Sequence, residues 1–133
     1  VSVFVQGDTF VVDYNAFDDH VIVESEVPVP TGDVALTARF RRGEGMAGSV
    51  AIAIDGVDAG SAELPLLMRV MSSVGSSIGY DHGSPVSARY GGPFPFSGTL
   101  HELVVQLIAR EGADGLEPDD AGNAQAREGM ARQ

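Results

Sequence analysis

The chain lacks cysteine and tryptophan, and all of its basic residues are arginine. Without cysteine there is no disulfide framework, no thiolate metal site and no cysteine nucleophile. No run approaches the roughly 18 apolar residues that span a bilayer, so we expect no membrane-spanning helix. The chain opens at Val1 within a strand-like pattern rather than at a methionine, and we expect it to be a piece of a longer or processed protein.

Positive charge is also scarce, since 19 acidic side chains stand against 8 basic ones and the formal net charge is −11. Such a chain is repelled by phosphate backbones and by anionic lipid surfaces, so nucleic acid and membranes are not expected partners. Hydrophobic residues make up 44% of the 133 residues, which is enough for one folded domain with a core.

What the sequence does contain is a repeated alternation of apolar and polar residues, the period of a β-strand. Turn signals separate the runs, the strongest being Asp55-Gly56, with Gly7-Asp8 as a second. The predicted strands cover residues 1–6, 9–14, 20–27, 33–41, 49–54, 57–62, 64–70 and 98–108. Seven or eight short strands predict an all-β fold, an antiparallel β-sandwich or barrel.

The composition changes after residue 108. Residues 109–133 carry six acidic side chains and no aromatic ones, with glycine at four positions. This composition is typical of a flexible segment. We therefore predict a β-sandwich domain over 1–108 and a polar, flexible C-terminal tail over 109–133.

Several segments of the chain match short sequence patterns that occur together in one family of domains. Val11 to Phe17 is similar to the pattern Y-x-Y-N-x-F, and Glu26 to Gly32 is similar to x-x-P-L-P-x-G. Val50 to Gly60 resembles V-x-L-x-V-D-G-x-x-V-G, a hairpin that laminin-G-like sandwiches share widely. The most specific segment runs from Ile78 to Tyr90 and resembles V-G-x-D-x-G-S-P-V-S-x-x-Y. Phe96 to Leu100 is similar to F-T-G-x-I/V. Together these segments resemble the C-terminal domain of bacterial arylsulfatases of the actinobacterial type.

The resemblance implies a jelly roll of the concanavalin A-like or laminin-G-like type. It also implies a place beside a catalytic sulfatase domain on the same polypeptide, whose activity is the hydrolysis of sulfuric esters. The family's catalytic C/S-x-P-x-R motif is absent from this chain, since Ser84-Pro85 is not followed by arginine at the required position. We therefore expect this fragment to be a non-catalytic accessory domain, with no catalytic residues and no cofactor of its own.

A loop rich in glycine and aromatic residues holds the candidate site, because loops on a rigid sandwich commonly carry binding function. Its candidate residues for ligand binding or domain docking are Tyr80, Asp81, His82, Tyr90, Phe94 and Phe96. Asp81 is a candidate Ca²⁺ ligand together with loop carbonyls. The alternative interpretation is that the Asp81 side chain caps the turn through hydrogen bonds to the backbone.

The remaining chemistry-bearing residues are interpreted as structural. His20 and His101 lack the spacing of a metal site, and Ser84 has no base at a recognisable spacing. Asp18 and Asp19 are adjacent, so on a strand they point to opposite faces and form no acid–base pair. Two functions stay open: the accessory domain of a sulfatase, and a free-standing, lectin-like module that binds carbohydrate, with or without Ca²⁺.

Overall fold

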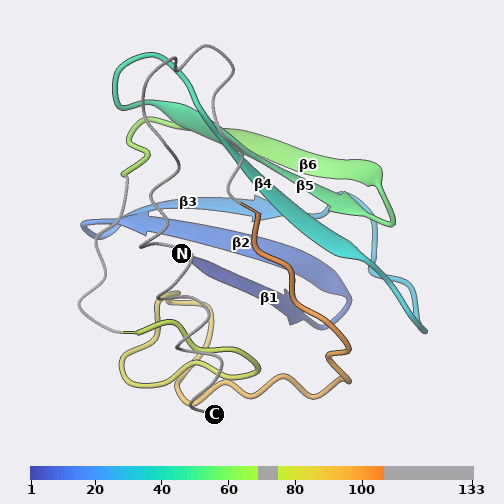
Figure 1. The fold of residues 1–133 in the computed structure, drawn as a ribbon. Coiled ribbons are helices and arrows are strands. Elements are labelled where there is room, and N and C mark those ends of the chain that lie inside the picture. The colour runs from blue at the N-terminus through green and yellow to red at the C-terminus, as the bar shows by residue number, and fades with distance from the viewer. Residues whose placement is uncertain (69–74, 107–133) are drawn as a thin grey trace. The chain divides into compact units, whose positions relative to one another are not determined.

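A computed structural model describes residues 1–68 and 75–106 of the chain, which divides into two compact units, Val1–Leu100 and His101–Gln133. The first unit contains six β-strands in two antiparallel three-stranded sheets (Figure 1). The described residues contain no helix, and so none long and apolar enough to cross a membrane. The predicted all-β class is confirmed, and the arrangement is sandwich-like.

The N-terminal sheet consists of β1 (Ser2–Gln6), β2 (Thr9–Ala16) and β3 (Asp19–Glu24), paired in that order. Two-residue turns join the strands, with Gly7 in a left-handed conformation at the first turn. The second turn uses Phe17 and Asp18, both at positive φ. Because both turns are short, they set the register that pairs Asn15 with His20.

The second sheet consists of β4 (Leu36–Arg42), β5 (Gly48–Ile54) and β6 (Val57–Leu64), again paired in chain order. Asp55 and Gly56 form the turn between β5 and β6 at φ values of 51° and 79°. This is the two-residue hairpin that the Asp-Gly signal predicts, since a type I′ turn needs positive φ at both central residues.

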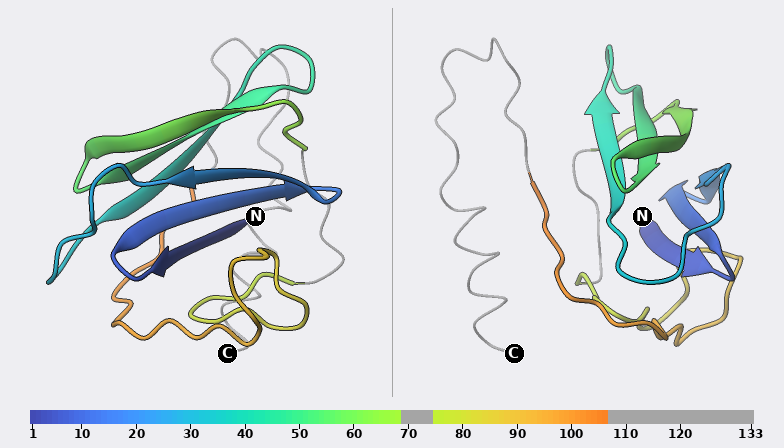
Figure 2. Two further views of the ribbon diagram at one scale, coloured as in Figure 1. Left: turned by 180° about the vertical axis from the view of Figure 1, so that it is seen from behind. Right: turned by 90° about the vertical axis from the view of Figure 1, so that its right-hand side faces the viewer.

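The core lies between the two sheets and follows from the alternation along the strands. One face of β2 contributes Phe10, Val12, Tyr14 and Ala16, and β5 contributes Val50, Ile52 and Ile54 from the facing side. Figure 2 shows the two sheets as separate layers in its right-hand view. Burying these side chains stabilises the fold by roughly 1.5–3 kcal/mol for each large residue.

The two sheets come together along β3 and β6. The Glu26 amide donates a hydrogen bond of 2.8 Å to the Ala59 carbonyl, which extends the contact between β3 and β6 into the following segment. A Cβ atom at Gly60 would lie 2.9 Å from the Glu24 carbonyl oxygen, so only glycine allows this approach. A bulge at Ile52/Ala53 in the pairing of β5 with β6 accommodates Ala59, whose side chain is buried in the core.

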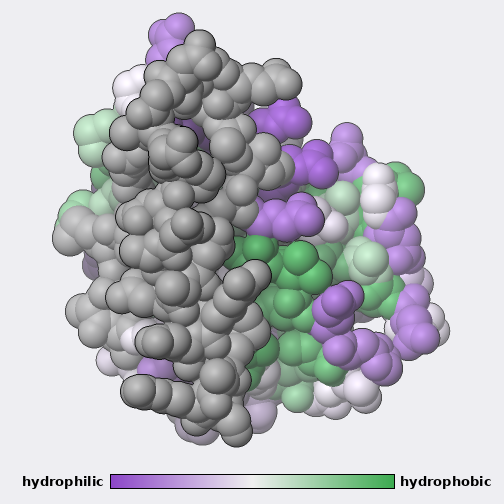
Figure 3. Space-filling view, in the orientation of Figure 1, coloured by the Kyte–Doolittle hydropathy of each residue, from purple (hydrophilic) through white to green (hydrophobic). Residues whose placement is uncertain are grey.

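The opposite side, between edge strands β1 and β4, is more open. Val3 of β1 is 51% exposed and Phe40 of β4 is 36% exposed, although both lie on the inner faces of their sheets. Figure 3 shows one face of the molecule, on which hydrophobic residues, in green, lie beside hydrophilic ones, in purple.

An irregular segment of residues 75–100 covers the outer face of the β1–β2–β3 sheet. The Gln6 side chain donates a hydrogen bond to the Arg89 carbonyl, and the Arg89 guanidinium pairs with the Glu24 carboxylate. Under this cover the outward-facing side chains Val11 and Asp13 have no exposed surface. The segment is therefore a third layer, and it buries the β2 part of this outer face, whereas Ile22 on β3 stays 42% exposed.

Two predicted strands are wrong where the structure describes them. Residues 98–106 of the predicted strand 98–108 pair with no other strand, and Leu103, Val104 and Val105 are all more than half exposed. An alternating pattern makes a strand only when a partner supplies its hydrogen bonds, and no described strand does. Of the predicted strand 64–70, Leu64 ends β6 and residues 65–68 are irregular. Residues 69–70 and the predicted tail 109–133 lie outside the described residues.

Candidate functional site

The loop singled out by its sequence is organised around the Asp81 carboxylate. Asp81 Oδ2 accepts a hydrogen bond of 3.2 Å from the Val86 amide and one of 2.6 Å from the Tyr90 hydroxyl. Gly79 and Gly83, both with φ of 82°, allow the chain to turn on either side of Asp81. The carboxylate thus holds together both ends of the segment between residues 81 and 90.

Tyr90 connects this loop to β1. Its hydroxyl lies 2.7 Å from Ser2 Oγ, and since the Tyr90 proton is directed to Asp81, Ser2 donates and Tyr90 accepts. Burial raises the pKa of the Tyr90 phenol above 10.0, and the hydrogen bond to Asp81 raises it further. Both causes act in the same direction, because each disfavours the phenolate.

Two of the predicted aromatic residues point onto the sheet rather than into solvent. The Tyr90 and Phe94 rings are stacked with centroids 4.4 Å apart. The Phe4 ring meets both edge-on, at 5.0 Å from Tyr90 and 5.8 Å from Phe94. Such pairs stabilise packing by about 0.5–1.5 kcal/mol beyond the area that they bury. Tyr90 and Phe94 therefore anchor the loop to β1.

The other predicted aromatic residues lie at the surface. Tyr80 is 53% exposed and its ring centroid lies 6.1 Å from that of His82. The Phe96 amide donates a hydrogen bond of 2.7 Å to the Gly79 carbonyl, which places Phe96 next to the segment that carries Ile78 and Tyr80. Ile78, Tyr80 and Phe96, all roughly half exposed, form what we call the 78/80/96 patch.

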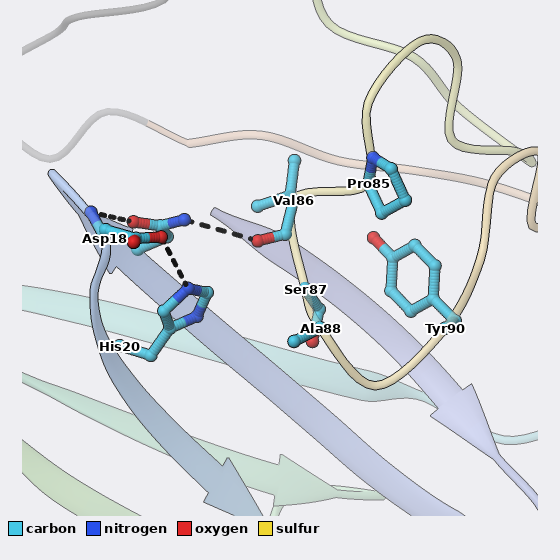
Figure 4. Close-up of a pocket in the computed structure, with 8 residues that line it drawn as sticks. Asp18, His20, Pro85, Val86, Ser87, Ala88 and Tyr90 are labelled. Carbon is cyan, nitrogen blue, oxygen red and sulfur yellow. Dashed lines mark hydrogen bonds and ion pairs between the residues drawn. The ribbon is translucent and has the colours of Figure 1, made fainter.

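A shallow pocket of about 300 Å³ lies between the β2–β3 hairpin and the anchored loop (Figure 4). Its lining residues are Asn15, Asp18, His20, Pro85, Val86, Ser87, Ala88 and Tyr90. Asn15 spans the two sides, because its Nδ2 donates to the Val86 carbonyl at 3.4 Å and its Oδ1 accepts from the Asp18 amide at 2.9 Å. Of the predicted site residues, only Tyr90 lines this pocket.

A buried carboxylate stands behind the pocket. Asp13 has no exposed surface, and its Oδ1 lies 2.8 Å from Nδ1 of His20. The other oxygen, Oδ2, has no hydrogen-bond partner within the described residues. A buried acceptor without a partner is costly, by roughly 1–3 kcal/mol, and native proteins keep few of them. The side chain of His20 is 25% exposed, and its Nε2 lies 3.9 Å from Asp18 Oδ1.

Neither His20, interpreted as structural, nor Asp13 is among the site residues predicted from the sequence. The signal that could have brought them together is the two-residue turn at Phe17-Asp18, which pairs Asn15 with His20 and Asp13 with Ile22. That register makes Asp13 and His20 diagonal neighbours on one face of the sheet, within reach of each other. The burial of this face could not be foreseen, because the covering segment comes some 70 residues later in the chain.

The arrangement offers hydrogen-bonding groups but no evident nucleophile. Ser87 is only 1% exposed, and its hydroxyl oxygen accepts a hydrogen bond from the Arg89 amide. Within residues 1–68 and 75–106, no three His, Asp or Glu side chains lie close enough together to hold a metal ion. The carboxylate of Asp81 caps the turn, in agreement with the alternative interpretation of that residue.

Comparison with known proteins finds no matching family model, no matching curated protein and no matching solved structure. The resemblance to the sulfatase C-terminal domain thus rests on the sequence segments alone.

Proposed function

We propose that this chain is a non-catalytic accessory domain of a bacterial arylsulfatase and packs against the catalytic domain of the same polypeptide. On this proposal the fold is a jelly roll of the concanavalin A-like or laminin-G-like type. The activity of the whole protein is the hydrolysis of sulfuric esters. The segment with the most specific resemblance, Ile78 to Tyr90, supports a structural role for the motif, because its Asp81 and Tyr90 bond to each other.

The observation that carries the proposal is the 78/80/96 patch. Three large, exposed apolar side chains belong to two stretches of the loop, and the Phe96–Gly79 hydrogen bond joins the backbones of these stretches. Adjacent apolar side chains on a well-anchored surface are typical of protein–protein and domain–domain contacts. The catalytic domain is the occupant that we assign to this patch.

The first test is the intact mass of the native gene product in its source cells. We expect a mass several times 13.9 kDa, with peptides upstream of Val1 that contain C-x-P-x-R or S-x-P-x-R. A product that begins near Val1 and has no catalytic partner would overturn the proposal.

The second test replaces Tyr80 and Phe96 together by serine in the full-length product. If the patch docks on the catalytic domain, the variant should melt in two separate steps and become cleavable between the domains. Val57→Ser is the matched control, since Val57 is 69% exposed at the β5–β6 turn. If melting and cleavage are unchanged in the double variant, the patch does not contribute to the contact between the domains.

A carbohydrate-binding module is the second candidate function. It is favoured by the pocket, where Asn15, Asp18 and His20 lie opposite a mostly apolar wall. Ca²⁺ at Asp81 belongs to this candidate, although Asp81 Oδ2 already accepts two hydrogen bonds. A rise in melting temperature with Ca²⁺ that Asp81→Asn abolishes would support that ion, since a ligand bound only by the folded state stabilises it.

A further inference from the structure

We propose that the pocket between the β2–β3 hairpin and residues 85–90 binds a neutral carbohydrate, with His20 and Asp18 as its polar contacts and Phe17 as a stacking surface. The inference goes beyond the accessory role and rests on the second candidate function. It places the binding site away from the 78/80/96 patch, in a pocket that only Tyr90 of the predicted site residues lines.

The two walls of the pocket differ in chemistry. The hairpin side presents an amide, an imidazole and a carboxylate from Asn15, His20 and Asp18. The loop side is mostly apolar, with Pro85, Val86, Ala88 and the Tyr90 ring beside Ser87, which is only 1% exposed. A sugar ring also combines polar and apolar surfaces, because hydroxyl groups project from its rim while its faces expose C–H groups. Its hydroxyl groups can therefore face the polar wall while a ring face packs on the apolar one. Pockets with an apolar lining and a few placed polar groups are the usual form of small-molecule sites.

His20 is held for such a role by the buried Asp13 carboxylate. The contact between Asp13 Oδ1 and Nδ1 directs the proton to Nδ1, which leaves Nε2 as the ring atom facing away from Asp13. Fixing a histidine tautomer through a buried carboxylate is costly here, since Asp13 Oδ2 has no partner among the described residues. An unpartnered, fully buried oxygen directly behind a pocket residue is the kind of feature that functional sites retain.

The two-residue turn at the mouth of the pocket needs positive φ at both central residues, but it does not need an aromatic side chain. Phe17 and Asp18 adopt φ values of 55° and 73°, and an aromatic residue is a poor choice for the left-handed region. Phe17 nevertheless stands there with 70% of its surface exposed, directly before the pocket residue Asp18. Strain of this kind gathers at ligand sites. An exposed ring is also the surface on which a sugar face stacks.

The negative charge around the pocket favours a neutral ligand over an anionic one. Two carboxylates, Asp13 and Asp18, flank His20, and the chain as a whole carries a net charge of −11. A sulfated or phosphorylated sugar would meet like charge at the pocket. A neutral hexose has no such penalty, and its hydroxyl groups can donate to the exposed Asp18 carboxylate.

The test is a titration of the ¹⁵N-labelled 133-residue chain with glucose, galactose and cellobiose up to about 50 mM, a range that suits the weak affinity of single sugars. We expect at least one of them to shift the amide signals of residues 15–20 and 85–90. Glucose 6-sulfate should bind more weakly than glucose. No shift with any sugar, shifts centred on the 78/80/96 patch, or tighter binding of the sulfated sugar would each overturn the inference.

Phe17→Gly is the decisive variant, because glycine relaxes the turn while removing the ring. Affinity should fall about tenfold without loss of folding, whereas Tyr80→Ser, the matched control on the other aromatic surface, should bind as the original chain does. Equal binding by Phe17→Gly would exclude the ring from the site. These measurements do not involve the upstream polypeptide. A negative result would therefore not bear on the sulfatase proposal, which the intact-mass measurement tests separately.

Discussion

The outer faces of the two sheets differ although the sheets are built alike. Each sheet is a three-stranded antiparallel meander with a two-residue turn before its last strand. The outer face of the β4–β5–β6 sheet presents arginines and small residues at the surface, among them Arg39 and Ala51. The outer face of β1–β2–β3 lies under residues 75–100 and buries Val11 and Asp13 completely. The covered face is also the one that forms the pocket.

The largest expected difference between the faces concerns a charge placed at their centres. Val11→Glu would bury a carboxylate without a partner and should cost at least about 4 kcal/mol of unfolding free energy, close to the total stability of a small domain. Ala51→Glu, at a partly exposed position on the other face, should change it by less than about 0.5 kcal/mol. Urea unfolding of both variants measures the contrast. Similar losses would show that the two faces are equally covered.

The second effect comes from the hydrogen bond between Asp13 and His20 on the covered face. His20→Ala should cost about 2–3 kcal/mol, because the buried Asp13 carboxyl would lose the hydrogen bond to the imidazole. Replacing Asp13 and His20 together by valine should recover most of that loss, since no buried polar group is then left without a partner at this place. Thermal unfolding of the single and double variants tests this. A double variant as unstable as the single one would refute the account of the pair.

A smaller effect concerns the bonds that hold the covering loop. Tyr90→Phe removes the hydroxyl that joins Asp81 to Ser2 and should cost about 1–2 kcal/mol. Because the folded state raises the pKa of Tyr90 above 10.0, the unfolded chain loses this proton first as the pH rises. Tyr90 therefore contributes its full stabilisation below pH 10, and that contribution should be lost above it. The variant should show a shallower loss of stability in alkaline urea titrations.

The smallest effect compares the two equivalent turns. Phe17→Gly should stabilise the protein by about 0.5–1 kcal/mol, because relief of the left-handed strain exceeds the entropy that glycine loses on folding. Gly56→Ala at the other turn should destabilise it by about 1 kcal/mol, since φ there is 79°. Differential scanning calorimetry resolves both changes. Destabilisation by Phe17→Gly would mean that the ring supports the fold.

Much of the fold could be predicted because its determinants are local. The Asp55-Gly56 dipeptide and the flanking alternation predict the hairpin that β5 and β6 form. The predicted strand 9–14 is found as Thr9–Ala16, since its alternating residues meet a core. The predicted strand 98–108 has the same kind of pattern, yet its described residues have no partner strand. A pattern shows which face of a segment is apolar, but pairing depends on residues distant in the chain.

The candidate loop was predictable as a loop and only partly as a site. Glycines, prolines and aromatic residues mark it in the sequence, but they do not show that Tyr90 and Phe94 turn onto Phe4 while Tyr80 stays exposed. The pocket was beyond prediction, because Asn15 and Val86 meet only after the loop folds back over the sheet.

The sequence by itself determined the all-β class, the positions of the hairpins and the strongly acidic character, since alternation, turn residues and charge are properties of neighbouring residues. Only the tertiary structure decided that Asp13 is buried, that His20 contacts it, and that one sheet is covered on both faces. The physical reason is that burial depends on the segment that lies above a residue. Here that segment is more than 60 residues away in the chain.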